Sequence, residues 1–516
     1  MKRNILTIAV LFSSMFIMSQ TEFDALKFVE TDINGTARYM SMAGAFGALG
    51  GDPSAIKDNP AGLGIYRKSE ITGTMNVLMQ QTASKWNKTN AYDDLYKLNA
   101  NNMAFIFAVP TWRIESGNSG LQSSNWAFNY NRLKNFNRNL NIKGGSSGSS
   151  ITDYFAYFSA GIIGTDLAYT DKYEPFDNVN VPWISVLAYK GYLMNESPTK
   201  PGVWSSLLNN DEKVLPAYSL QEQGFVDEYS LGWSGNFSNK FFVGATLNLK
   251  SIDYRVNSIY SENYDEGGGM SLSNEYSTLG TGMNLNLGAI FVPVDFIRIG
   301  LSLHSPTIYT LKDYYYAKLD YNSGADKSGW ITTPKDGYSD YKIQSPLQYN
   351  ISVAFIAGTN GLLSAEYSKV NYQGTRFIGI DNKTQFRDEN DGMREMMNNA
   401  RTIKVGGEYK LTDNFAVRAG YANSSSPTQT TAAKYMRYNT IRTDTEYFLR
   451  NRTDYLSAGF GYKESGWHID FAFMNKIIDE NYYPYNSNNL DENLAVAPAR
   501  VITSNNNIVV TLGFKF

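Results

Sequence analysis

The feature that most constrains this chain is an alternation of apolar with polar or small residues, which recurs from about residue 69 to the C-terminus. In the segment NFAVRAGYAN, Phe415, Val417 and Tyr421 share one face, and Arg418 lies on the other. Successive side chains of a β-strand point to opposite faces, so each such segment has one apolar face and one small or polar face. A chain with an apolar face on nearly every strand needs an apolar environment for those faces.

Short turns and long polar loops separate these segments alternately, except that the connection at 111–122 is longer than expected. Tight turns at 238–240, 293–295, 412–413 and 463–465 follow even-numbered segments, whereas long connections follow odd-numbered ones, the longest at 138–223. We expect strands at 69–82, 101–110, 123–137, 224–238, 241–257, 272–293, 296–311, 341–357, 361–373, 401–411, 414–424, 452–463, 466–477 and 504–516. An even strand count with short turns on one side is typical of bacterial outer-membrane barrels. The sequence therefore predicts an all-β fold, a 14-stranded antiparallel transmembrane β-barrel.

Aromatic residues near the short turns support the barrel prediction. On the predicted lipid face these are Phe237, Phe241, Tyr409, Phe415, Tyr462 and Trp467. Such residues form girdles where barrel strands meet the headgroups. The C-terminus, NNIVVTLGFKF, alternates in the same way and ends on Phe516, the pattern that barrel-insertion machinery reads. A secreted β-sandwich or propeller is the alternative, but neither needs outward apolar faces on nearly every strand.

The N-terminus indicates export from the cytoplasm, and the composition excludes several classes of protein. Residues 1–20 place Lys2 and Arg3 before an apolar run from Ile5 to Met18, the pattern of a signal peptide. No later segment has the ~18 apolar residues that a transmembrane helix needs. The chain has no Cys, which excludes a disulfide-stapled scaffold, and a net charge of -3, which gives no indication of nucleic-acid binding.

Residues 21–68 lack strand alternation and carry two possible helices, TEFDALKFVE and ARYMSMAGAFGALG. Eight strands enclose a lumen that side chains fill and sixteen or more leave a channel, so a fourteen-stranded barrel without a plug would leak. We therefore expect residues 21–68 to plug the lumen of a barrel formed by residues 69–516.

The stretch GGDPSAIKDNPAGLG, residues 50–64, lies within this predicted plug. Its glycine spacing fits neither dinucleotide-binding nor Walker A loops. We expect Asp52 to cap a helix with Pro53 at its first position, and Asn59-Pro60 to end that helix.

Three segments resemble the FadL family of outer-membrane transporters of long-chain fatty acids and other hydrophobic compounds, which includes the TodX aromatic-hydrocarbon porins. NGTARYMSMAGAFGALGGDPSAIKDNPAGLG is similar to the family's hatch, and Asn59-Pro60-Ala61 matches its Asn-Pro-Ala signature. GTGMNLNLGAIFVPVDFIRIGLSLHSPT and GGEYKLTDNFAVRAGYANSSSP resemble two later hairpins. The family's strand number agrees with the fourteen segments counted here.

This resemblance implies passive uptake of hydrophobic small molecules across the outer membrane of a Gram-negative bacterium. It implies a monomer in contact with outer-membrane lipid and lipopolysaccharide, without a cofactor. It also implies that the hatch gates passage through Asn59, Pro60, Ala61 and Gly62; a purely structural turn is the alternative. A kinked third strand provides a lateral opening in the family, but SSNWAFNYNRLKNFN contains neither Gly nor Pro. Lateral and periplasmic exit therefore both stay open.

Candidate substrate contacts lie in the longest loop and in the lumen. The loop holds two apolar pieces, ITDYFAYFSAGIIG and VPWISVLAYKGYLM, which form either a binding groove or the core of an ordered loop. The candidates are Phe155, Phe158, Ile162, Trp183, Ile184, Leu187 and Leu193. Arg298 and Arg418 point inward by parity, and a guanidinium can bind a fatty-acid carboxylate through two hydrogen bonds.

Two other functions remain open from the sequence. A barrel of this family could hold secreted cargo, as the shuttle barrel of the type 9 secretion system does. His304 and His468, the two histidines, could ligate haemin if they met, although ordinary lumen polar residues are the simpler reading. We find no catalytic arrangement and no metal-binding cluster in the sequence, so we expect a protein that is not an enzyme.

Overall fold

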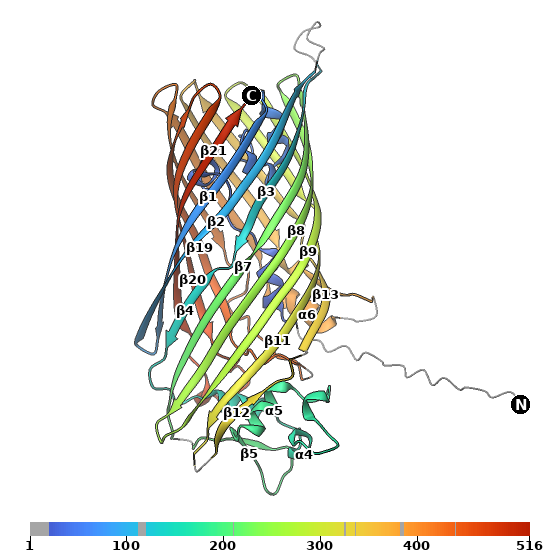
Figure 1. Ribbon diagram of the computed structural model, residues 1–516, viewed down its shortest axis with the longest axis vertical. Helices are drawn as coiled ribbons and strands as arrows, with labels where there is room; N and C mark the ends of the chain where they lie inside the picture. The colour runs from blue at the N-terminus through green and yellow to red at the C-terminus, as the bar shows by residue number, and fades with distance from the viewer. Residues whose placement is uncertain are drawn as a thin grey trace, which may run out of the picture.

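The computed structural model describes residues 20–111, 120–209, 211–324, 327–335, 337–381, 386–438 and 440–516. The predicted signal peptide lies outside these residues, except for Gln20. The strands form one closed ring, because the last strand, β21 (Ala499–Lys515), pairs with the first, β1 (Glu70–Trp86), along almost its whole length. Figure 1 shows the result, a tall barrel of tilted antiparallel strands.

Within the described residues the ring has fourteen strand positions, as predicted. Besides β1 and β21, eight positions are single strands: β2 (Thr89–Pro110), β7 (Val214–Phe237), β8 (Phe241–Tyr264), β9 (Gly269–Val294), β17 (Asn399–Lys410), β18 (Phe415–Ser425), β19 (Tyr447–Lys463) and β20 (Trp467–Tyr483). Four positions consist of two consecutive strands: β3 (Leu121–Asn135) with β4 (Arg138–Lys143), β10 (Ile297–His304) with β11 (Ile308–Asn322), β13 (Gly337–Gln344) with β14 (Gln348–Ala357), and β15 (Gly361–Asn371) with β16 (Arg376–Gly379). A short strand, β12 (Ser328–Thr332), pairs with β11 outside the ring.

The predicted alternation is present in the wall. Leu301 on β10 is 56% exposed on the outer face, while its neighbours Gly300 and Ser302 are buried toward the lumen. Ile508, Leu512 and Phe514 of β21 likewise lie on the outer face. None of the helices in the described residues is long and apolar enough to cross a bilayer.

Several strands are longer than the alternation predicts. Residues 83–100, expected to form a loop, extend β1 and β2 into a hairpin whose turn residues, Asn87 and Lys88, both have positive φ. β7 and β8 each have 24 residues, about twice what a bilayer requires. Beyond the hydrocarbon layer the strands continue to pair, but lipid no longer selects apolar residues for their outer face.

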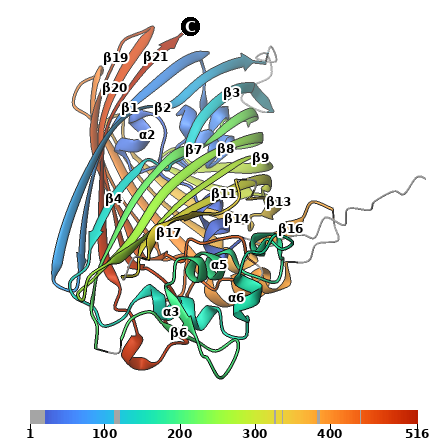
Figure 2. The ribbon, with the colours of Figure 1, turned by 60° about the horizontal axis from the view of Figure 1, so that its bottom comes forward.

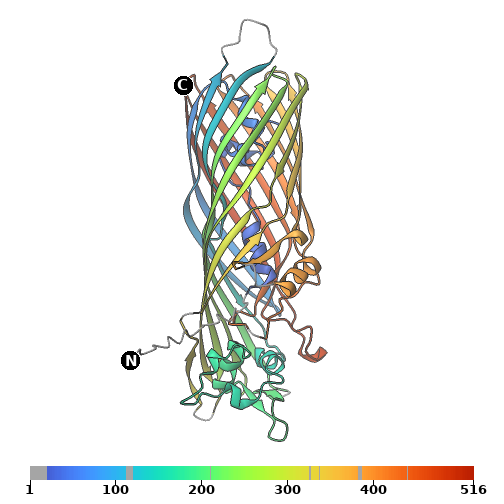
Figure 3. The ribbon, with the colours of Figure 1, turned by 90° about the vertical axis from the view of Figure 1, so that its right-hand side faces the viewer.

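Residues 20–66, called the hatch segment below, lie inside the barrel. They contain α1 (Glu22–Val29), α2 (Ala37–Ser41) and two 3-10 helices, η1 (Pro53–Lys57) and η2 (Pro60–Ile65). Figure 3 shows these blue helices between the walls, with α1 toward the long-loop end and the others toward the end that holds the C-terminus. Most of the segment is buried.

The long loops fold over the end of the barrel opposite the C-terminus, the end that barrel architecture places outside the cell (Figure 2). We call residues 144–213 the extracellular cap. The cap contains α3 (Ile151–Phe158), α4 (Gly164–Leu167), η4 (Pro175–Asp177), α5 (Trp183–Lys190) and the ribbon of β5 (Met194–Glu196) and β6 (Trp204–Ser206). Three further helices lie in other connections at this end: η5 (Tyr372–Gly374), α6 (Arg387–Met396) and η6 (Glu492–Leu494).

Candidate functional site

The Asn59-Pro60 turn sits at the short-turn end of the lumen and joins the hatch segment to the wall. Asn59 is 2% exposed; its Oδ1 accepts from the Ala61 amide at 3.1 Å, and its Nδ2 donates to the carbonyls of Gly47 at 2.7 Å and Ala289 at 3.3 Å. Pro60 is the first residue of η2, where its missing N–H costs nothing. The Asp52 cap of η1 with Pro53 at its start is confirmed, since Ser54 donates to Asp52 at 2.9 Å.

Glycines of the wall make this close approach possible. A Cβ on Gly244 of β8 would lie 2.5 Å from the backbone of Pro60, and one on Gly288 of β9 would lie 2.0 Å from Asn59 Oδ1. Within the hatch segment, Gly50 and Gly62 meet in the same way, with Gly50 at a φ of +59°. Larger residues at these positions would push the turn off the wall.

Ion pairs connect the rest of the hatch segment to the barrel. Glu30, the residue after α1, binds Arg450 of β19 through two hydrogen bonds of 2.8 Å each and lies 3.5 Å from Lys134 of β3. Further pairs are Glu22–Arg437 at 3.2 Å, Asp24–Arg442 at 2.9 Å, Asp32–Lys476 at 2.6 Å, Arg38–Glu408 at 2.9 Å and Asp58–Lys404 at 3.5 Å. The sequence indicated charged residues in these segments but could not indicate which ones would meet.

The third strand position is broken, and the break opens the hydrogen bonding of the wall. β3 pairs with β2 only over Asn102–Pro110, and β4 pairs with β7. Over 89–101, the described residues provide β2 with a backbone partner only on its β1 side. In Figure 1 the arrow of β3 ends near mid-height of the barrel, which places this break in its long-loop half.

β4 lies on the lumenal side of the β1–β2 hairpin. Thr82 and Ser84, which point into the lumen from β1, donate to carbonyls of β4 at 3.1 and 2.7 Å, and Gln80 donates to the carbonyl just before β4 at 3.1 Å. Among the described residues, one side-chain hydrogen bond, from Asn141 Nδ2 to Asp93 Oδ2 at 2.7 Å, joins β4 to the free edge of β2. We call this discontinuity between β2 and β4 the wall break.

The glycine that permits the break is on the neighbouring strand. Gly224 of β7 has a φ of +120°, and a Cβ there would lie 2.0 Å from the Asp253 carbonyl. Its carbonyl accepts from the Phe136 amide at 3.0 Å, in the gap between β3 and β4. Asn135 accepts from the Asn137 amide at 2.9 Å, which forms a local turn. The absence of Gly and Pro from strand three therefore does not keep it straight.

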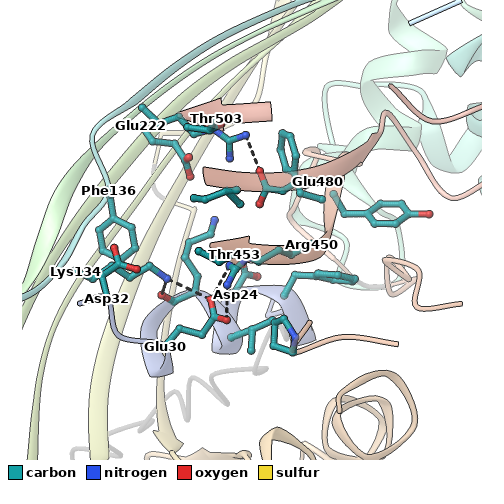
Figure 4. Close-up of a pocket in the computed structure, with 18 of the residues that line it drawn as sticks. Asp24, Glu30, Asp32, Lys134, Phe136, Glu222, Arg450, Thr453, Glu480 and Thr503 are labelled. Atoms are coloured by element: carbon teal, nitrogen blue, oxygen red, sulfur yellow. Dashed lines mark hydrogen bonds and ion pairs between the residues drawn. The ribbon is translucent and has the colours of Figure 1, made fainter. Parts of the chain in front are cut away.

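A chamber of about 270 Å³ lies beside the break, between α1 and the wall. Figure 4 shows Lys134 and Asp32 side by side below Phe136, with Glu30, Asp24 and Arg450 close to them. Tyr254 packs edge-on against Phe136 at 4.8 Å between ring centroids and adds a second aromatic face. The chamber thus combines ring faces with charged groups that are largely paired with one another. We call it the outer chamber.

A second chamber of about 540 Å³, the periplasmic chamber, lies at the short-turn end of the hatch segment. Both predicted arginines line this chamber, but their partners differ. Arg418 is held between Glu408 and Asp470, at 2.6 Å from each, whereas Arg298 donates to the Leu49 carbonyl at 2.9 Å. Among the described residues, no carboxylate lies within ion-pair distance of Arg298. Arg298 is therefore the better placed of the two to meet an anionic group.

The predicted apolar contacts of the long loop lie in the core of the extracellular cap. Phe155, Phe158, Trp183, Ile184, Leu187 and Leu193 are buried, and Ile162 is half-buried against the same core. They pack on one another, which is the second of the two predicted alternatives; Phe158 also lines a pocket at the extracellular end.

The two histidines lie apart and have protein partners. His304 Nε2 lies 2.9 Å from the Asp58 carbonyl. His468 contacts Asp470 at 2.8 Å and Glu70 at 2.9 Å, so both its ring nitrogens are engaged. The described residues contain no group of three or more side chains arranged to hold a metal ion. This geometry gives no support to a shared haem iron.

A closed ring of fourteen strands around its own N-terminal segment defines a plugged transmembrane β-barrel. Residues 227–516, more than half of the chain, match the family described as outer membrane protein transport protein (OMPP1/FadL/TodX), and the chain belongs to this family. It is thus an outer-membrane transport protein of a Gram-negative bacterium.

Solved structures with the same fold include transporters from pseudomonads. A Pseudomonas aeruginosa FadL homologue is 13% identical, with a TM-score of 0.52 over 94% of this chain and 99% of that chain. The Pseudomonas putida toluene transporter TodX is 12% identical, with a TM-score of 0.51 over 95% of this chain and 100% of that chain. A comparison with curated proteins gives no match. At these identities the likeness establishes the fold.

Proposed function

We propose that this protein passively takes up hydrophobic small molecules, such as long-chain fatty acids or aromatic hydrocarbons, and that displacement of the hatch segment opens the path. Membership of the FadL/TodX family and the role of TodX as a toluene transporter support this class of substrate. The observation that carries the gating proposal is the chemistry of the plug: besides apolar contacts, the hatch segment meets the wall through many hydrogen bonds and ion pairs.

Such contacts suit a plug that has to move. A buried ion pair adds little net stability, because the cost of removing both charges from water offsets most of their attraction. When the hatch segment shifts, water can solvate the separated groups again.

Apolar contacts oppose the movement. The core around Tyr39 and Phe46 includes wall residues such as Tyr455 and Met474. Phe28 of α1 packs against Phe136 and Tyr254. Displacement of the segment therefore exposes some apolar surface, and a small movement costs less than full removal.

The wall break provides a lateral route from the outer chamber. Over residues 89–101 the free edge of β2 faces β4, and one side-chain hydrogen bond, from Asn141 to Asp93, spans the gap. When displacement of the hatch segment admits a hydrophobic molecule to this gap, the molecule leaves the lumen through the side of the barrel without crossing the periplasmic chamber. The periplasmic route also requires displacement, in this case of the Asn59–Gly62 turn, which makes Asn59, Pro60, Ala61 and Gly62 gating residues of that path.

Uptake measurements test the proposal and separate the two routes. Cells that lack other uptake barrels and express this protein should accumulate radiolabelled oleate or toluene faster than cells with an empty vector. Equal rates would overturn the proposal. In an Asp93→Cys, Asn141→Cys variant, a short reducible thiol cross-linker should slow uptake by the lateral route and a reductant should restore it. Unchanged uptake after complete cross-linking would instead favour periplasmic exit.

A further inference from the structure

The extracellular end carries a pocket that lies outside both lumenal chambers. It has a volume of about 510 Å³, within the range of small-molecule sites. It lies between α3 of the extracellular cap, α6, the connection from β18 to β19 and the connection from β20 to β21. Its lining includes Tyr438, Phe158, Glu389, Arg437 and Asn486.

A row of parallel aromatic rings forms one side of this pocket. Tyr154 stacks on Phe158 at 5.7 Å and 12°, and Phe158 stacks on Tyr438 at 5.6 Å and 11°. Tyr154 and Phe158 are buried, whereas Tyr438 is 67% exposed at the end of the row. The row therefore holds Tyr438 in place and leaves it open to a ligand with a flat apolar face. No contact with the lumenal chambers explains this exposed ring.

Polar groups lie beside the ring, and one of them lacks a partner. Glu389 of α6 is 2% exposed, and its Oε2 has no hydrogen-bond partner, although a buried acceptor normally has one. Its Oε1 lies 3.7 Å from Arg437 Nε. Asn486 lines the same pocket and can both donate and accept. This oxygen is covered by protein atoms, so a ligand hydroxyl exchanges hydrogen bonds with the Asn486 amide and the Arg437 guanidinium, and reaches the carboxylate when the Glu389 side chain turns toward the pocket.

We propose that this pocket binds a pyranose ring of a carbohydrate. A pyranose has an apolar C–H face that fits an aromatic ring, and hydroxyls around its edge that both donate and accept. A hydrocarbon would make no hydrogen bond with the Asn486 amide or the Arg437 guanidinium. An organic anion would meet the acidic groups Asp388 and Glu389 beside Arg437. The site is independent of the proposed transport of hydrophobic molecules.

The pocket also shares a residue with the hatch segment. The Arg437 guanidinium that lies near Glu389 donates to Glu22 of α1 at 3.2 Å. A sugar hydroxyl that binds Arg437 competes with Glu22, so occupation of the pocket weakens one attachment of α1 to the loops.

Binding is tested on the purified full chain in lauryldimethylamine oxide, a detergent without a sugar headgroup. Saturation-transfer difference spectra are recorded with methyl pyranosides of glucose, galactose, mannose and N-acetylglucosamine, and with phenol. We expect at least one pyranoside to bind, and Tyr438→Ala to weaken it about tenfold, or ~1.4 kcal/mol. Glu389→Gln should also weaken it. Tyr169→Ala is the control. Tyr169 is an exposed tyrosine of the extracellular cap that lies outside the pocket, so its loss should leave binding unchanged.

Three results would overturn the proposal: no pyranoside binds, binding survives both pocket substitutions, or only phenol binds. The bound pyranoside should also raise amide hydrogen exchange in α1 at least about twofold; unchanged exchange would refute the coupling through Arg437. Because these readouts need no transport, they are separate from the uptake assay.

Discussion

The side-chain amide of Asn59 donates to the carbonyl of Gly47 over 2.7 Å and so ties together the two ends of residues 47–59. The same amide reaches the Ala289 carbonyl of β9 at 3.3 Å. One side chain therefore holds the glycine-rich turn closed and holds it against the wall.

Replacing Asn59 by Ala should loosen this turn. The variant loses the cap of η2 and both carbonyl contacts, and loss of a cap alone costs about 0.5–2 kcal/mol. We expect higher ion conductance in planar bilayers than for the native protein. Asn257→Ala removes an exposed Asn of β8 and is the matched control. Native-like conductance in Asn59→Ala would contradict a gating role for the turn.

Gly244→Ala should displace the hatch segment from the wall. The new methyl group would lie 2.5 Å from Pro60 backbone atoms, and overpacking of this kind costs about 1–3 kcal/mol. Thermal melting followed by circular dichroism should show a lower Tm. Gly73→Ala on β1 adds a methyl group with nothing within 4 Å and should leave the Tm unchanged. Equal Tm values for the two variants would show that the hatch segment does not press on β8.

Attachment of α1 to the loops should depend on pH through Glu22. Burial raises the pKa of Glu22 from 4.5 to about 7, although Arg437 partly opposes the shift. Detached α1 would expose Glu22 and return its pKa toward 4.5. The attached state is thus favoured below pH 4.5, and this advantage is lost as pH rises through 7.

Hydrogen exchange measures this dependence. After correction for intrinsic rates, α1 amides should open roughly tenfold more often at pH 8 than at pH 5.5, since one unit of pKa shift equals ~1.4 kcal/mol. Glu22→Gln should remove most of the difference. Equal protection of native α1 at both pH values would argue against the buried carboxyl as its cause.

Arg298→Gln should distinguish anionic from neutral substrates. If a fatty acid passes the periplasmic chamber, loss of a charge-assisted hydrogen bond of about 1.5–3 kcal/mol should raise its apparent KM roughly tenfold or more. Toluene, which has no charge, should be taken up at the native rate. Lys410→Gln removes another cation that lines this chamber and is the control. Equal effects on both substrates would exclude recognition of a carboxylate by Arg298.

The strand number could be predicted from the sequence because lipid selects an apolar outer face wherever a strand crosses it. Strand lengths could not, since residues 83–100 pair beyond the lipid, where no such selection acts. The wall break was missed for a different reason. Its glycine, Gly224, lies on β7, and nothing in the sequence of β3 alone indicates which strand will be its neighbour.

In the candidate site, too, features set by local sequence could be predicted, whereas features set by tertiary contacts could not. The Asp52 cap could be predicted from local sequence, because it bonds an amide two residues ahead. The Asn59 cap has the same local basis, although we expected Asn59-Pro60 only to end the preceding helix. The choice between Arg298 and Arg418 depends on Glu408 and Asp470, which only the folded barrel brings to Arg418. Apolar residues such as Phe155 were expected in the long loop, but tertiary packing decides that they face one another.

The central claim, that the hatch segment must leave the wall for uptake, is tested most directly by locking it in place. A Cβ on Gly47 would lie 3.0 Å from the Cβ of Ser352 on β14, near the ~3.5–4.5 Å of bridged cysteines. In a Gly47→Cys, Ser352→Cys variant, we expect uptake to fall to the empty-vector level when the disulfide forms, and to return with reductant. Gly47→Cys alone should not respond to reductant. Native uptake by protein with a fully formed disulfide would contradict the account.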